Sequence, residues 1–159
     1  DPGLTSTGYG VIDVGSERKI AVEGGVIYTK SDSPLEYRLN KIFTEIIDVV
    51  KTHGPEEMAI EDLHSNPSFV KTAILMAHAR GVMVLVAGSM GIPVFNYAPT
   101  RVKNLITGSG RAPKQQVMQS VAIHLGEPDI TKNEHVADAF AIALCHAMMS
   151  TVPFPTLVN

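Results

Sequence analysis

Three carboxylates stand where a folded chain would expose them at the ends or in the middle of regular elements. Asp1 precedes Pro2-Gly3, Glu61 ends a short apolar segment, and Asp138 interrupts an otherwise apolar helical run. Asp138 is the most informative, because an unpaired carboxylate buried in an apolar helix is costly and a bound cation would compensate its charge. The sequence therefore predicts a cation site built from acidic side chains.

A histidine accompanies the third carboxylate. His135 and Asp138 are three residues apart, so on a helix both side chains lie on one face. Carboxylates from separate elements with an imidazole beside them suit Mg²⁺ or Mn²⁺, and two such ions can activate a water and stabilise the leaving oxygen in phosphodiester hydrolysis. Spacing alone leaves a second interpretation open, in which Asp138 and His135 cap or bridge a neighbouring helix and Asp1 starts a turn.

Of the adjacent acidic residues Glu61 and Asp62, only one can join such a cluster, because neighbours on a strand face opposite sides. Glu61 is the candidate, since it ends the apolar pattern in register and Asp62 already belongs to the following loop. Four further histidines fall on predicted helices without acidic company and are assigned no role: His53, His78, His124 and His146.

The formal net charge of −3 is unusual for a nucleic-acid-binding protein, because phosphate neutralisation depends on lysine and arginine. Binding depends on a local patch, however, and residues 101–114 hold four basic residues and no acidic one. This segment is the candidate basic surface.

Length and composition fit one domain. A chain of 159 residues with 45% hydrophobic content can bury one sizeable core. The single cysteine, Cys145, excludes an internal disulfide and fits a small core residue in a reducing, cytoplasmic compartment. No apolar stretch approaches a membrane span, because even residues 81–91 are interrupted by small and polar residues. Residues 1–150 are predicted to form the domain and residues 151–159 a flexible tail.

Strands alternate with helices along the chain. Segments rich in valine, isoleucine, tyrosine and glycine predict strands at 7–13, 20–30, 57–61 and 93–97, the first two forming a hairpin. Apolar residues at helical spacing, with proline and glycine at the ends, predict helices at 34–53, 67–90, 100–106, 113–125 and 133–150. The pattern predicts a single-domain α/β fold in which helices pack on both faces of a mixed sheet.

Several short motifs occur in an order typical of one protein family. They are Asp1-Pro2-Gly3, Thr7-Gly8-Tyr9-Gly10, Ala59-Ile60-Glu61, Ala79-Arg80-Gly81-Val82, Val102-Lys103, Gly108-Ser109-Gly110, Lys114-Gln115-Gln116-Val117 and His135-Val136-Ala137-Asp138-Ala139. In this order they resemble the RuvC family of Holliday junction resolvases. The resemblance spans residues 1–149 and implies an RNase H-like fold, a homodimer, and Mg²⁺-dependent paired nicking of four-way DNA junctions in recombination and repair.

Carried over position by position, the resemblance implies that Asp1, Glu61 and Asp138 are catalytic metal ligands. His135 falls where family members have aspartate or histidine, and as a fourth catalytic residue it would bind a metal ion or carry a proton. The site would use Mg²⁺, with Mn²⁺ as a substitute and two ions in each site.

The resemblance also implies DNA contacts from two segments. Lys103 and Lys114 fall on basic positions of the family and would contact backbone phosphates, to which we add Arg111 from the same segment. After the second acidic motif, many members have an aromatic residue that stacks at the junction centre. In this chain His64 or Phe69 could take that place.

Three expectations concern what surrounds the domain. The family's first strand lies ahead of the Asp-Pro-Gly motif, so the resemblance implies an apolar strand before Asp1 and a chain truncated there. The dimer interface is expected on an apolar face of helix 67–90 that includes Met83 and Val84. The resemblance further suggests a RuvA/RuvB-like branch-migration complex as a partner.

Three other functions share some of these sequence features. A YqgF-like nuclease acting on ribosomal RNA would share the fold, although the long helix and Arg80-Gly81-Val82 favour the resolvase. An actin-type ATPase would need a second domain, which 159 residues do not supply. A module that holds junctions without cutting them would have no need of an acidic cluster with a histidine.

Overall fold

Four strands in the described part of the chain form two sheets of two strands each. The computed structural model describes residues 1–63 and 70–150. β1 (Ser6–Val14) and β2 (Lys19–Tyr28) form an antiparallel hairpin, and β3 (Met58–Glu61) and β4 (Val94–Tyr97) pair in parallel. Both strand orientations of the predicted mixed sheet are present, but the two pairs form separate sheets.

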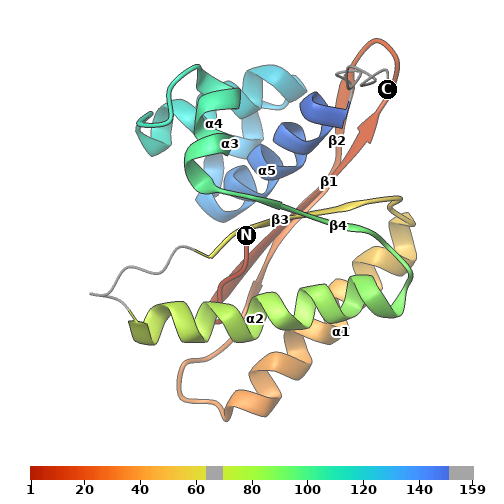
Figure 1. The fold of residues 1–159 in the computed structure, drawn as a ribbon, viewed down its shortest axis with the longest axis vertical. Coiled ribbons are helices and arrows are strands. Elements are labelled where there is room, and N and C mark those ends of the chain that lie inside the picture. Colours follow the sequence, from red (N-terminus) through yellow and green to blue (C-terminus); the bar gives the residue numbers. More distant parts are fainter. Residues whose placement is uncertain (64–69, 151–159) are drawn as a thin grey trace, which may run out of the picture.

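The helices form two groups. Their bounds are α1 (Leu35–His53), α2 (Val70–Ser89), α3 (Pro99–Thr107), α4 (Lys114–Leu125), the 3₁₀ helix η2 (Pro128–Lys132) and α5 (Glu134–Ser150). Figure 1 shows α1 and α2 at one end of the strands and α3, α4 and α5 at the other. The predicted helices are therefore present, whereas η2 was not predicted.

Each helix group has its own buried core. Ile42 of α1 and Val86 of α2 are fully buried in one core together with Ile60 of β3. In the other core, Val121 of α4 packs with Leu144 of α5. Helix α5 is buried along most of its length, as its apolar sequence predicted, and Cys145 is one of its core residues. Since α5 also packs across β1, it is rigidly placed relative to the hairpin.

Helix α2 differs from expectation in two ways. By length and composition alone this 20-residue helix is apolar enough to cross a membrane, whereas the sequence was expected to contain no such stretch. In this fold Met83 and Val86 turn inward to the core shared with α1, so the expected place of Met83 in a dimer interface is wrong. The outward face carries Ile74 and Leu85, which are 52% and 61% exposed.

Candidate active site

An asparagine fixes the start of the helix that carries two of the candidate residues. The side-chain Oδ1 of Asn133 accepts hydrogen bonds from the backbone N–H groups of His135 at 3.0 Å and Val136 at 3.4 Å. These are donors that the first turn of a helix leaves without backbone partners. The cap sets the direction in which the first turn of α5 presents Glu134 and His135, with Asp138 one turn further on.

The first residue of the chain meets that first turn. The ring Nδ1 of His135 lies 3.2 Å from Oδ2 of Asp1. The contact depends on Gly8, because a Cβ at this position would lie 2.2 Å from the backbone oxygen of His135. Thr7 Oγ1 donates a 2.6 Å hydrogen bond to the carbonyl of Gly3 and holds the turn after Asp1. β1 and α5 therefore bring Asp1 and His135 together.

The other two carboxylates line a solvent-open hollow with two lysines. Glu61, Lys103, Lys114 and Asp138 contribute to its wall, which lies between the end of β3 and helices α3, α4 and α5. This places two predicted metal ligands beside two predicted phosphate-binding lysines. Arg111 is exposed in the loop ahead of α4, and His64 and Phe69 lie outside the described residues.

Lys114 is already paired with acidic groups. Its Nζ lies 3.0 Å from Oδ2 of Asp138 and 3.0 Å from Oε2 of Glu134. Burial acts to lower the pKa of Lys114, but the hydrogen bonds to Glu134 and Asp138 and the negative charges of these two groups together outweigh burial and raise the pKa above its usual value. Lys114 thus remains an ammonium ion at neutral pH.

The backbone of Asp1 links the two parts of the site. Its amine donates to the carbonyl of Gly8 at 3.1 Å, and the N–H of Gly8 donates to the carbonyl of Asp1 at 3.0 Å. The negative charges of Glu61 and Asp138 both act on this buried backbone nitrogen. Glu61 and Asp138 therefore lie within electrostatic reach of Asp1.

The donor set suits a hard divalent cation, although it is not closed around one point. Three carboxylates and an imidazole are oxygen and nitrogen ligands of the kind that Mg²⁺ and Mn²⁺ accept. Within residues 1–63 and 70–150, no three histidine, cysteine, aspartate or glutamate side chains lie close enough to hold a metal together. At Asp138 the compensating cation is the ammonium of Lys114.

Arg80 holds the end of β3, a role that sequence reasoning did not assign. Its Nε donates to the backbone carbonyl of Glu61 at 3.3 Å, and its guanidinium lies 3.7 Å from Asp62 and donates to Asn96. The contact turns Asp62 toward Arg80 and leaves the side chain of Glu61 at the hollow. A charged residue within the apolar helix α2 is the signal that could have singled out Arg80.

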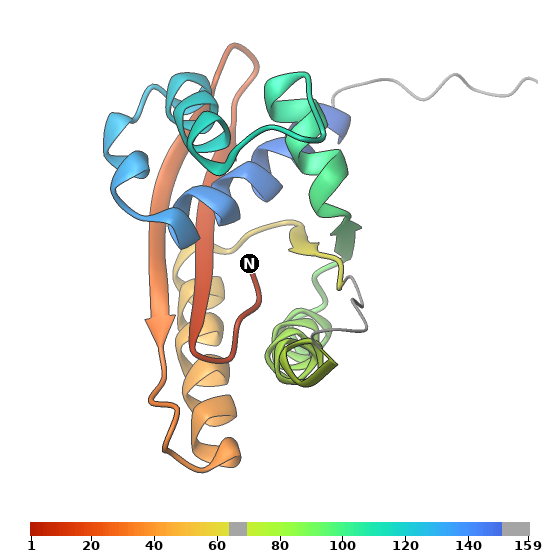
Figure 2. The ribbon, with the colours of Figure 1, turned by 90° about the vertical axis from the view of Figure 1, so that its left-hand side faces the viewer.

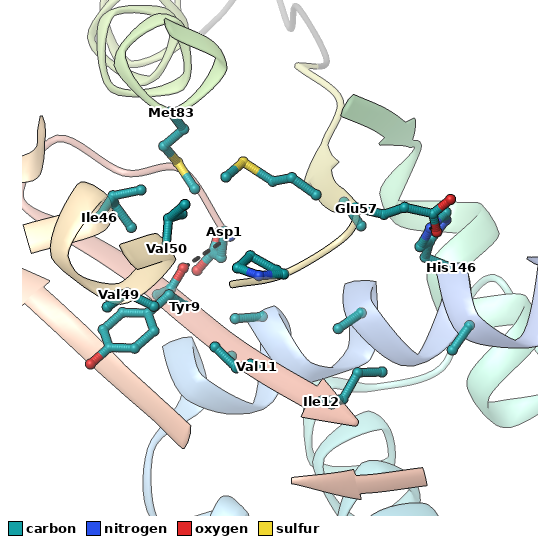
Figure 3. Close-up of a pocket in the computed structure, with 18 residues that line it drawn as sticks. Asp1, Tyr9, Val11, Ile12, Ile46, Val49, Val50, Glu57, Met83 and His146 are labelled. Carbon is teal, nitrogen blue, oxygen red and sulfur yellow. Dashed lines mark hydrogen bonds and ion pairs between the residues drawn. The ribbon is translucent and has the colours of Figure 1, made fainter. Parts of the chain in front are cut away.

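A cavity of about 150 Å³, open to solvent, extends from Asp1 between the two sheets. Residues 8–12 and 57–59 line it, together with side chains of α1, α2 and α5, and Figure 3 shows Asp1 within it and the Glu57–His146 pair at its far side. Asp1 and Gly8 are bonded as an antiparallel pair. In Figure 2 the segment ahead of β1 runs alongside that strand, and the marked N-terminal end lies between the hairpin and the β3–β4 pair.

His146, which sequence reasoning left without a role, joins α5 to the second sheet. Its Nε2 lies 2.6 Å from Oε2 of Glu57 and its Nδ1 lies 2.7 Å from the hydroxyl of Tyr97. The ring also packs on Phe95, with 4.4 Å between ring centroids. This network fixes α5, which carries Asp138, against β3, which carries Glu61.

Comparison with known proteins decides the family. The family model described as Crossover junction endodeoxyribonuclease RuvC matches residues 1–146. The chain belongs to the RuvC family. The RuvC proteins of Rhodopirellula baltica and Desulforamulus reducens are 43% and 40% identical to it, over 96% and 95% of this chain and 86% and 92% of theirs.

Solved RuvC structures share the fold. Thermus thermophilus RuvC matches with a TM-score of 0.86 at 31% identity, over 94% of this chain and 92% of that chain. T. thermophilus RuvC in complex with a Holliday junction substrate matches with a TM-score of 0.85 at 32% identity, over 94% and 91% of the two chains. The predicted fold class and family are thereby confirmed.

Proposed function

We propose that this RuvC family member is a Holliday junction resolvase, which makes paired symmetric nicks in four-way DNA during recombination and repair. The observation that carries the proposal is one surface on which Glu61 and Asp138 line a hollow with Lys103 and Lys114, next to the contact between Asp1 and His135. Acidic groups for hydrolysis and basic groups for phosphate are both needed by a nuclease. The T. thermophilus structure with a Holliday junction substrate supports the choice of substrate.

Asp1, Glu61, Asp138 and His135 would hold Mg²⁺, or Mn²⁺ in its place, as two ions in each site. When bound, these ions supply activation of a water and charge neutralisation at the scissile phosphate. Asp1 orients the His135 ring through Nδ1, which makes the other ring nitrogen the one available to bind or to move a proton.

The basic residues position the DNA. Lys103 and Lys114 stand at the hollow and would contact the phosphates beside the scissile bond, while Arg111 on the exposed loop would contact the backbone further out. The stacking role at the junction centre stays a proposal for His64. None of these contacts reads base sequence.

A homodimer would set two such sites at a fixed separation and pair the cuts by symmetry. The outward face of α2 is the proposed interface. A shallow hollow on this face is lined by Ile74, Ala77, His78, Gly81, Val82 and Leu85.

We also propose a cytoplasmic location, a RuvA/RuvB-like branch-migration partner, and a domain ending near residue 150, with residues 151–159 as a tail.

The test is cleavage of a labelled synthetic four-way junction, a matched linear duplex and a structured RNA, each in Mg²⁺ and in EDTA. Paired nicks in the junction alone, absent in EDTA, are the expected result. Binding without cutting would make the protein a junction-holding module, and preferred cutting of RNA would place it with YqgF-like nucleases.

A further inference from the structure

The ammonium group of Lys114 pairs with two carboxylates, and the proposed chemistry uses only one of them. Asp138 is a proposed metal ligand, whereas Glu134 has no part in that set. Glu134 and Asp138 are four residues apart on α5, so they share a face, and Lys114 is the first residue of α4. One ammonium group therefore spans the starts of two helices at the edge of the active site.

A metal ion that binds Asp138 through Oδ2 would compete with Lys114 for that oxygen. Lys114 Nζ lies 3.0 Å from Oδ2 of Asp138. The side chain of Asp138 is 28% exposed, compared with 55% for Glu134, so Asp138 is the deeper of the two partners. A cation that binds Asp138 through this oxygen must first displace the ammonium.

Glu134 can keep the ammonium group of Lys114 beside the site after a metal ion displaces it from Asp138. Its Oε2 already lies 3.0 Å from Lys114 Nζ, while its other oxygen is 4.0 Å from Nε2 of His135. A lysine with no second partner would either stay on Asp138 or swing into solvent. With Glu134 present, it can leave Asp138 and remain beside the hollow that holds Lys103.

We propose that Lys114 is a built-in counter-ion of Asp138 that a metal ion displaces, and that Glu134 is the positioning residue that then keeps Lys114 at the site. This inference rests on the proposed metal site of Asp138. Glu134 acts through Lys114 and binds no metal itself. Its negative charge lowers the cost of moving the ammonium off Asp138.

The decisive experiment is a double-mutant cycle on Mn²⁺ affinity, measured by isothermal titration calorimetry without DNA. Glu134→Gln should weaken Mn²⁺ binding by about fivefold, because Asp138 is then the only carboxylate that pairs with Lys114 and the metal ion must displace the lysine from it. Lys114→Met should strengthen Mn²⁺ binding. In the Lys114→Met background, Glu134→Gln should change the affinity by less than about twofold.

The cycle separates this mechanism from general electrostatics. If Glu134 attracted the metal merely by its charge, Glu134→Gln would weaken Mn²⁺ binding equally with and without Lys114, and that result overturns the inference. Lys132→Met removes a positive charge that pairs with Asp129 and should leave the affinity unchanged. Glu134→Asp, which keeps the charge, should restore most of the affinity lost in Glu134→Gln.

Failure of the metal site itself gives a different result. If Asp138→Asn binds Mn²⁺ as tightly as the parent chain, Asp138 is not a metal ligand and that part of the proposed function is wrong. If Asp138→Asn loses Mn²⁺ but the cycle is additive, only the role of Glu134 is wrong. Lys114 and Glu134 side chains are 46% and 55% exposed, so these variants should keep the thermal stability of the parent.

Discussion

The His135 ring lies 3.2 Å from the Asp1 carboxylate, which joins the first turn of α5 to the segment ahead of β1. The two residues are 134 positions apart, so the contact exists only when the hairpin and α5 are packed together. His135 is consequently oriented by a charged partner rather than by its own helix. The same contact makes its role testable by substitution.

His135→Ala should lower junction cleavage by about a hundredfold or more, the range expected when a positioned proton carrier is lost. His135→Asp should retain most activity, because the family resemblance places aspartate or histidine there. Single-turnover cleavage at saturating protein measures both variants. An alanine variant that cuts at the parent rate would remove His135 from the catalytic set.

Gly8→Ala should damage the site and the fold together. The added methyl would sit 2.2 Å from the backbone oxygen of His135, so α5 must shift away from β1. We expect a loss of about 1–3 kcal/mol in the free energy of unfolding and slower cleavage.

Gly88→Ala is the matched control for that change. Gly88 lies in α2 and an added Cβ would meet no atom within 4 Å. The Gly88→Ala substitution should leave the free energy of unfolding unchanged or raise it, since alanine favours a helix more than glycine does. Urea denaturation compares the two variants, and equal stabilities would show that β1 and α5 are not in close contact.

Ile74→Glu combined with Leu85→Glu should convert the proposed dimer to a monomer, because both side chains lie on the outward face of α2. Ile123→Glu is the control, since Ile123 on α4 is 80% exposed and lies elsewhere on the surface. Light scattering across a concentration series reports the mass. A double variant that remains dimeric would exclude this face as the interface.

Tyr9→Phe should destabilise the protein more at neutral pH than in acid. The Tyr9 hydroxyl donates to Glu23 at 2.8 Å, and this bond and that from His53 hold the pKa of Glu23 below its usual 4.5. A carboxyl with a lowered pKa contributes stability above pH 4.5 and loses it as the pH falls through the lowered value.

The expected loss for Tyr9→Phe at pH 7 is about 1 kcal/mol, the usual net value of such a bond. Burial raises the pKa of Tyr9 to about 12, so the hydroxyl remains a donor throughout this range. Tyr37→Phe, at an exposed tyrosine, should show no such pH dependence. Thermal unfolding at pH 3 and pH 7 compares the Tyr9→Phe and Tyr37→Phe variants. If Tyr9→Phe loses the same stability at both pH values, the result would argue against the role of Glu23.

The sequence predicted the secondary-structure elements and the protein family better than it predicted contacts between residues that are distant in the sequence. The segments rich in valine, isoleucine, tyrosine and glycine predicted the β1–β2 hairpin, and the apolar run through Leu144 predicted a buried α5. The inner face of α2 could not be predicted, because a helix that is apolar on most sides has no periodicity to separate Met83 from Leu85.

Contacts between distant elements were also beyond the sequence. Lys114 was assigned to phosphate binding from its motif, but its pairing with Asp138 depends on how α4 packs on α5. Glu134 was overlooked, since an acidic residue in the first turn of a helix is ordinarily explained by the helix dipole. The separation of the strands into two sheets depends on backbone pairing that no local pattern specifies.

The central claim is that the acidic cluster cuts four-way DNA, and the most direct measurement compares binding with cleavage in Glu61→Gln and Asp138→Asn. Both variants should bind a synthetic junction as tightly as the parent in EDTA, since they retain Lys103, Arg111 and Lys114, yet produce no nicks in Mg²⁺. If either variant still makes paired nicks at the parent rate, the hydrolysis does not depend on this cluster and the account is contradicted.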